Sequence, residues 1–208
     1  MTQVIPAFVD GKLAPVEKME VHRRGLKHPA VSVFILRGPE ILLQRRALEK
    51  YHTPGLWANT CCTHPDWGED VAACALRRLR EELGITGLTP EYRGHVAYRA
   101  DVGGGLIEHE EVEVFVAQAD IAMPFTPNPD EVMATAWVQY DDLIAQVTVR
   151  DESERSIARG DDNTVSVLVR HELRCIAYRQ LGSANRYRVV VDFNQSLPEQ
   201  KTTAGDIV

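Results

Sequence analysis

Residues 28–37, HPAVSVFILR, form an apolar run with the length and composition of a buried β-strand. Gly38-Pro39 interrupts the run, and ILLQRR at residues 41–46 predicts a second strand directly after it. Strand and helix patterns then follow in mixed order, without a regular strand–helix–strand alternation. This order predicts an α/β (α+β) fold in which helices pack on a mixed β-sheet.

The remaining elements can be assigned from periodicity and turn residues. Ala7–Leu13 carries Asp10-Gly11 between apolar flanks and predicts a hairpin. Asp70–Leu83 predicts a helix that stops at Gly84, with an apolar stripe made of Ala72, Cys74, Ala75, Leu76, Leu79 and Leu83. Further strands are predicted at 95–102, 110–119 and 135–140, and a helix is predicted from Asp141 onward.

Composition excludes several classes of protein. The 208 residues suffice for one domain with a sizeable core, and the net charge of −7 argues against nucleic acid or an anionic membrane as a partner. No run approaches the ~20 apolar residues of a membrane span, and the N-terminus lacks the pattern of a signal peptide. The four cysteines do not form the framework of a secreted disulfide protein. We therefore expect a cytoplasmic protein.

The stretch Cys61-Cys62-Thr63-His64 precedes the predicted helix and raises a question of chemistry. Adjacent cysteines rarely bridge each other because the ring is strained. A metal site, a nucleophile or plain packing all remain open for this stretch. The helix carries Glu69, Arg77, Arg78, Glu81 and Glu82, charges that would ordinarily form a solvated face. A Cys/His loop leading into that helix favours a site instead.

Residues 77–85, RRLREELGI, resemble the second half of the Nudix box, and Glu69 stands where that box has its first glutamate. Thr63 replaces the opening glycine of the box, and Arg78 replaces the glutamate after its arginine. The wider set of motifs, from about Val4 to Leu143, resembles type I isopentenyl-diphosphate Δ-isomerase, a branch of the Nudix superfamily. It includes LLQRRALEKYHTPGLWANTCCTHP, YRADVGGGLIEHEEVEVF and NPDEVMATAW.

The resemblance implies a Nudix-type α/β/α sandwich with a mixed sheet, formed by residues 1–146. It also implies an isomerase that interconverts isopentenyl diphosphate and dimethylallyl diphosphate and supplies isoprenoid biosynthesis. A Nudix diphosphohydrolase is the alternative enzyme, and the replacement at Arg78 weakens it. A non-catalytic metal-binding module built around Cys61, Cys62 and His64 is the alternative of another class.

The resemblance also implies two metal sites. One takes its ligands from three distant segments, namely His22, His28, His64, Glu108 and Glu110. A set of three imidazoles and two carboxylates suits Mn²⁺ or Zn²⁺. Glu82 matches the ligand of a second metal, Mg²⁺, which bridges to the diphosphate.

Catalytic and substrate-binding residues follow from the same comparison. Cys62 matches the catalytic cysteine, Glu110 serves as both metal ligand and acid/base, and Tyr98 orients that carboxyl group. The diphosphate is expected to bind Arg46, Lys50 and Arg78, with Lys18 as a further candidate. For Lys18 an ordinary solvated surface charge is the favoured interpretation.

Residues 147–208 depart from the resembled family. They contain none of the three tryptophans, whereas the family has an indole facing the developing carbocation there. Residues 147–163 are polar and unpatterned, and 186–195 have the pattern of a strand. We expect a weakly packed C-terminal segment and slow carbocation formation. The sequence indicates neither the oligomeric state nor the downstream pathway.

Overall fold

The computed structural model describes residues 3–51 and 53–139. The predicted helix from Asp141, the domain boundary at residue 146 and the predicted strand at 186–195 lie outside this range. Within it, the elements in chain order are β1 (Val4–Val9), β2 (Lys12–Glu17), α1 (Lys18–Arg24), β3 (His28–Arg37), β4 (Glu40–Arg46), β5 (Trp57–Ala58), β6 (Cys61–Thr63), α2 (Val71–Leu83), β7 (Glu91–Gly103), β8 (Leu106–Gln118) and β9 (Val132–Gln139).

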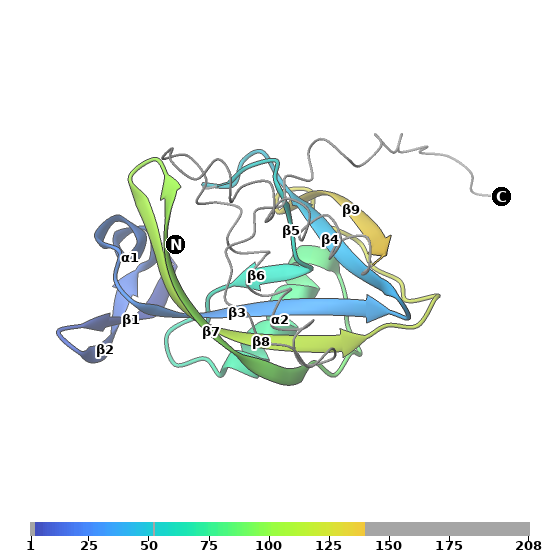
Figure 1. Ribbon diagram of the computed structural model, residues 1–208, viewed down its shortest axis with the longest axis horizontal. Coiled ribbons are helices and arrows are strands. Elements are labelled where there is room, and N and C mark those ends of the chain that lie inside the picture. The colour runs from blue at the N-terminus through green and yellow to red at the C-terminus, as the bar shows by residue number, and fades with distance from the viewer. Residues whose placement is uncertain (1–2, 52, 140–208) are drawn as a thin grey trace, which may run out of the picture.

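The predicted mixed sheet is confirmed. Strands β5, β4, β3, β8 and β7 lie in that order, with β6 paired to β3 and β9 paired to β4. Strand β3 runs parallel to β8, and the other pairs are antiparallel. The predicted hairpin is also present, as β1 and β2 joined at Asp10-Gly11, where both residues have positive φ. The hairpin and α1 sit together at one end of the sheet (Figure 1).

Helix α2 covers one face of the sheet and buries Cys74, Ala75, Leu79 and Leu83 against it. Asp70 caps its start by accepting from the backbone N–H groups of Ala72 and Ala73, and Gly84 ends it with φ of 66°. The predicted apolar stripe is wrong at Ala72 and Leu76, which are exposed. These two positions lie one turn apart on the flank of the helix, beyond the line along which α2 meets the sheet.

Two features were not predicted from periodicity. Strand β3 pairs with β4 only at Leu36 and Arg37, at the end of β3. Nearer its start the two strands diverge, and there β6 pairs with β3 at residues 31–33. Asn59 and Thr60 fill this divergence. The Asn59 amide donates to Ser32 Oγ and two carbonyl groups, and the Thr60 hydroxyl donates to Leu42 O and accepts from Ile35 N–H. These bonds fix β6 beside β3.

Helix α1 is the second feature that periodicity did not predict. It spans only two turns, and Glu17 caps it by accepting from the N–H groups of Met19 and Glu20. The helix ends at Gly25, in the left-handed conformation. Because a helix this short is marginal without tertiary contacts, α1 depends on its packing against β8 and the hairpin.

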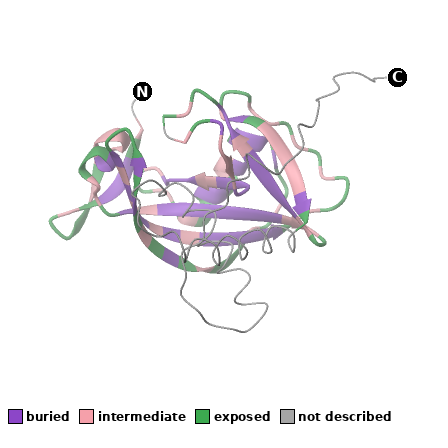
Figure 2. Ribbon diagram, turned by 45° about the horizontal axis from the view of Figure 1, so that its top comes forward, coloured by how far each residue is buried: buried purple, intermediate pink, exposed green. Residues whose placement is uncertain are grey.

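The central strands β3, β4 and β8 are mostly buried, whereas the edge strand β7 is largely exposed (Figure 2). One face of the sheet buries Phe34, Ile41 and Val114 among others, and the opposite face buries Val31, Leu42 and Phe115 under α2. No helix among the described residues is long and apolar enough to cross a membrane.

Glu69 joins the loop before α2 to the helix itself. Its carboxylate oxygens accept hydrogen bonds from Arg77 Nε at 2.6 Å and from Arg77 Nη2 at 2.7 Å. The carboxylate also accepts from the backbone N–H of Asp66. The hydrogen bonds from Arg77 are the main cause of a lowered pKa for Glu69. The first glutamate of the Nudix box therefore has a structural contact in this chain.

We predict that Glu69→Gln lowers the free energy of unfolding by about 1–3 kcal/mol near neutral pH. Since the folded state lowers the pKa of Glu69, its contribution is full above the unfolded pKa and is lost as pH falls through the folded pKa. The difference from wild type in urea unfolding should therefore shrink toward about pH 4 and below. Glu91→Gln, at an exposed acid paired with Arg93, should change stability little. A pH-independent loss would contradict the ionic contribution.

Candidate active site

Four of the five predicted ligands of the first metal site lie together in the structure. One ligand atom from each of His22, His28, His64 and Glu110 can be chosen so that all four lie within 4.8 Å of one another. They come from α1, the start of β3, the residue after β6, and β8. The three imidazole centroids are 4.9 to 5.2 Å apart, and all four side chains are buried.

Backbone carbonyl groups fix two of these rings. Nδ1 of His22 donates to Lys18 O, and Nδ1 of His28 donates to Leu26 O, both at 2.7 Å. Each ring therefore keeps its Nε2 lone pair for the cluster. Such a hydrogen bond on the second nitrogen is what typically orients a metal-binding histidine.

The electrostatics of the cluster favour a bound cation. Burial lowers the pKa of His64 well below its ordinary value, so that imidazole is neutral. Burial opposes ionisation of Glu110, but the neighbouring His28 ring, 3.6 Å away, and the hydrogen bond with His64 at 2.9 Å outweigh it and hold the pKa of Glu110 well below its ordinary value. A buried carboxylate beside the neutral imidazole of His64 carries negative charge that is costly unless a cation is bound.

Tyr98 connects the fifth predicted ligand to this group. Its hydroxyl lies 2.7 Å from Glu110 Oε2 and 3.0 Å from Glu108 Oε2, so one proton is shared between two buried carboxylates. Burial, followed by the charges of Glu110 and Glu108, raises the pKa of Tyr98 well above its ordinary value, which keeps this proton on the phenol. Glu108 is two residues from Glu110 along β8 and therefore points to the same face of the sheet.

These residues fit a divalent metal ion. Ligand atoms around one ion at about 2.0–2.2 Å lie at most about 4.4 Å apart, so the observed spread of 4.8 Å needs only small movements. Nδ1 of His64 is also buried without a hydrogen-bond partner among the described residues. The group is able to hold a divalent metal through imidazole nitrogen and carboxylate oxygen.

Cys62 lies on the same face of the sheet as the cluster. It is paired with Ser32 on β3, which is paired in turn with Val114 on β8, four residues after Glu110. Cys62 is also two residues before His64, a separation of roughly 6–7 Å in extended chain. Cys61 points the other way and is fully buried in the core under α2. The two adjacent thiols therefore have different environments.

The predicted diphosphate ligands gather beside this cluster. Lys18 belongs to α1, Arg46 ends β4, Lys50 follows it, and Arg78 is on α2. Burial, followed by the charges of Lys50 and Arg78, lowers the pKa of Lys18 to about 8. Lys18 is half-buried beside these other cations, a position that suits a diphosphate ligand, and its role there stays a prediction. Nε of Arg78 is buried without a hydrogen-bond partner in the described part of the chain, a donor that an anion could satisfy.

Glu82, the predicted ligand of a second metal, is buried at the C-terminal end of α2. It accepts from Arg78 at 2.5 Å and from the amide of Gln44 at 3.1 Å. It thus lies among the cations but not in the four-residue cluster.

Sequence reasoning missed two residues in this region. The ring of Tyr51 lies edge-on to His22 at 5.7 Å, with Lys18 Nζ 4.9 Å from its centroid. Glu131 forms ion pairs with Lys50 and Arg78. Tyr51 follows Lys50 in the sequence, and this position next to a predicted diphosphate ligand could have indicated that Tyr51 lies at the site. Glu131 is distant from its partners in sequence, and only the fold brings it there.

Comparisons with known proteins agree in family. The NUDIX domain matches residues 26–159. The isopentenyl-diphosphate Delta-isomerase of Roseobacter denitrificans is 63% identical over 147 residues, which cover 71% of this chain and 84% of that protein. The protein of the same name from Dinoroseobacter shibae is 62% identical over 152 residues, covering 73% of this chain and 86% of that protein.

Solved structures agree in fold. The MutT protein from Methanosarcina mazei Go1 aligns with a TM-score of 0.53 at 16% identity, over 74% of this chain and 96% of that one. The protein DR0079 from Deinococcus radiodurans aligns with a TM-score of 0.54 at 13% identity, over 76% and 99%. At these identities the likeness concerns the fold, and it confirms the predicted Nudix-type α/β sandwich.

Glu110→Gln should remove most of the bound divalent metal, because a neutral amide supplies no charge to offset the cation. Metal content per protein chain, measured after purification and dialysis, checks this result without reference to activity. Glu113→Gln is the matched control, since Glu113 is on the same strand and points to the opposite face. Full metal occupancy in the Glu110 variant would contradict its assignment as a ligand.

Proposed function

The chain belongs to the isopentenyl-diphosphate Δ-isomerases of the NUDIX family, and from this premise we propose how its buried site performs the reaction. The enzyme interconverts isopentenyl diphosphate and dimethylallyl diphosphate. The reaction adds a proton to the terminal carbon of the alkene and removes one from the methylene carbon next to the diphosphate-bearing carbon. Atoms and charge therefore balance without a co-reactant.

Two proton-handling groups are required, one on each side of the flat alkene. We assign Cys62 and Glu110 to these roles, with the substrate carbons held between them. The observation that carries this assignment is their common face: Cys62 lies two residues before His64 in the chain, and the His64 ring hydrogen-bonds Glu110 at 2.9 Å. Tyr98 would orient the carboxylate through its hydroxyl group.

His22, His28, His64 and Glu110 would hold a divalent ion, with Glu108 as a further ligand, and we propose Mn²⁺ or Zn²⁺ for this site. When bound, the ion would compensate the buried carboxylate and adjust its basicity. His22 and His28 would hold their positions through the hydrogen bonds on their second nitrogens. The chain's own contribution is a dry, oriented set of groups facing the alkene.

The diphosphate would bind the cluster of cations formed by Lys18, Arg46, Lys50 and Arg78, together with Mg²⁺ at Glu82. Burial, and after it repulsion by Lys50 and Arg78, disfavours the charged form of Lys18 and lowers its pKa. A diphosphate would relieve this repulsion. Arginine binds phosphate oxygens through its fork of donors, and lysine binds them as a point charge.

A single assay tests the function against the alternatives. Isopentenyl diphosphate is incubated with the protein and divalent metal, and the products are followed by proton NMR. An allylic product supports the isomerase. Release of phosphate would support the diphosphohydrolase. The positive charge of Arg78 argues against that function, because Arg78 stands where a Nudix hydrolase has a metal-binding glutamate. No reaction with retained metal would support a binding module.

We predict that Cys62→Ala abolishes isomerisation, by at least about 100-fold, while metal content and the unfolding midpoint are retained. The reason is that alanine removes the thiol proton and leaves the ligands in place. Cys61→Ala is the matched control, and it should keep most of the activity because Cys61 packs in the core. Wild-type turnover in the Cys62 variant would overturn the assignment.

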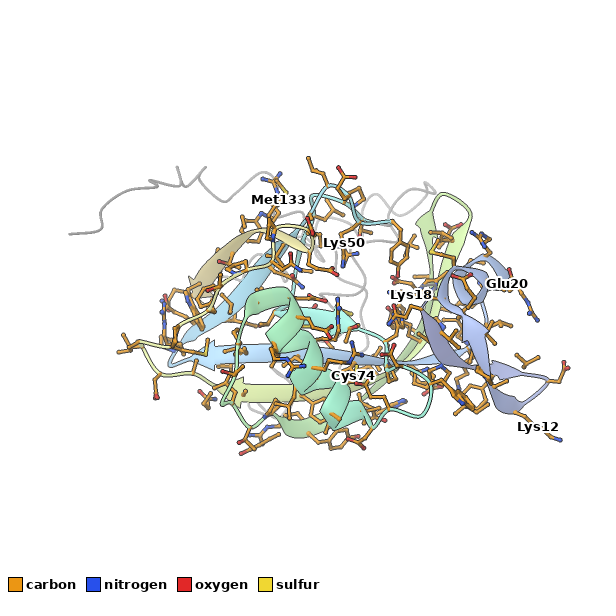
Figure 3. All side chains as sticks on the ribbon, turned by 180° about the vertical axis from the view of Figure 1, so that it is seen from behind. Lys12, Lys18, Glu20, Lys50, Cys74 and Met133 are labelled. Carbon is orange, nitrogen blue, oxygen red and sulfur yellow. The ribbon has the colours of Figure 1, made fainter. Side chains whose placement is uncertain are left out.

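Lys18→Ala is expected to raise KM for isopentenyl diphosphate by about 10- to 100-fold, with a smaller effect on kcat, because a charge-assisted hydrogen bond contributes about 1.5–3 kcal/mol. Lys12→Ala is its control, since Lys12 is exposed at the tip of the hairpin, away from Lys18 (Figure 3). Steady-state kinetics of both variants test whether Lys18 binds the substrate. A KM of the Lys18 variant equal to that of the wild type would show that Lys18 does not bind the diphosphate.

A further inference from the structure

Glu131 is an acidic residue inside the cluster of cations that the proposed function assigns to the diphosphate. Its carboxylate is divided between two of them: Oε2 pairs with Lys50, and Oε1 lies 3.3 Å from Arg78. Lys50 and Arg78 belong to different elements, the loop after β4 and helix α2. One carboxylate therefore bridges two parts of the chain that must act on the same anion.

The backbone of Glu131 is held as firmly as its side chain. Its N–H donates to Asn128 O, and its carbonyl accepts from Ala47 N–H, both at 3.0 Å. Asn128 N–H in turn donates to Glu82 O at 2.8 Å, which ties this turn to the end of α2. Glu131 is thus fixed to the loop that carries Lys50 and to the helix that carries Arg78. It cannot move away without breaking these contacts.

The environment of Glu131 supports a lasting ionic role. Burial opposes its ionisation, but hydrogen bonding and charge from Lys50, followed by the charge of Arg78, outweigh this effect and lower the pKa of Glu131. The side chains of Lys50, Glu131 and Arg78 are 18, 25 and 16% exposed, so water screens the three charges only partly. The negative charge of Glu131 also acts against the repulsion that Lys18 experiences.

We infer that Glu131 is a positioning residue, which fixes Lys50 and Arg78 at the separation that a diphosphate requires. This inference rests on the proposed function. A free lysine side chain carries about 2 kcal/mol of rotamer entropy, which substrate binding would otherwise have to remove. Holding the ammonium group in place beforehand makes binding tighter by avoiding that loss. Glu131 itself touches no reacting atom.

The test uses the nearly isosteric variant Glu131→Gln in the full chain. One amide oxygen can still accept from one cation, but the amide NH₂ then faces the other. We expect KM for isopentenyl diphosphate to rise about 10-fold, which corresponds to about 1.4 kcal/mol, while kcat changes less than about threefold. Glu40→Gln is the matched control, since Glu40 also holds an arginine, Arg37, on a different part of the sheet.

A double-mutant cycle separates positioning from a general structural effect. In a Lys50→Ala background, Glu131→Gln should cost less than in the wild type, because one of the groups that it positions is absent. Equal costs in both backgrounds would overturn the inference. A lower KM in the Glu131 variant would also overturn it, since it would mean that the acid competes with the substrate for the two cations.

Binding of inorganic diphosphate, measured by calorimetry with Mg²⁺ present, distinguishes failure of this inference from failure of the proposed function. If wild type binds and Glu131→Gln binds equally well, the positioning role is wrong and the diphosphate site stands. If wild type binds no diphosphate, the assignment of these cations fails, and the role of Glu131 fails with it. Retained metal in the cluster of His22, His28, His64 and Glu110 shows that each variant is folded.

Discussion

The buried carboxylate of Glu110 is the constraint on which the arrangement of the chain depends. An ionised carboxylate away from water is costly, and its partners must come from elsewhere in the fold because β8 alone supplies none of the imidazoles. α1, the start of β3 and the residue that follows β6 each bring one histidine to it. These three elements are therefore held together by the same requirement that makes the site able to bind a metal. Folding and metal binding are thermodynamically linked in such an arrangement.

The site has two ends, and α1 contributes to both of them. His22 belongs to the metal cluster, and Lys18, one turn earlier on the same face, belongs to the cations. The ring of Tyr51 contacts both residues and so lies at the junction between the two ends. A five-carbon diphosphate is short, so its two ends require binding groups at close range. A two-turn helix, in which the His22 ring donates to the Lys18 carbonyl oxygen, meets this requirement.

Much of the fold could be predicted from the sequence, because long periodic segments such as residues 28–37 and 71–83 are determined by their own hydrophobic pattern. α1 and β6 are too short for a periodic signal, and both depend on tertiary contacts. The ligand set came from resemblance, since no local pattern connects His22 with Glu110. The position of Lys18 beside the other cations is a property of the fold, which the local sequence does not indicate. The bridging role of Glu131 depends on a turn before β9, and neither its own position nor its neighbours indicate Lys50 or Arg78.

The divergence between β3 and β4, closed by Asn59 and Thr60, determines how the adjacent cysteines differ. Alternation along β6 sends Cys61 toward α2 and Cys62 toward the opposite face. Burial raises the pKa of the Cys61 thiol well above its ordinary value, which makes that sulfur chemically inert. Selection at position 61 thus concerns volume and polarity, and any small apolar side chain would satisfy it. Under the catalytic role that we propose for Cys62, selection at position 62 concerns the sulfur atom itself. Neighbouring codons for the same amino acid are therefore expected to drift at different rates among relatives of this chain.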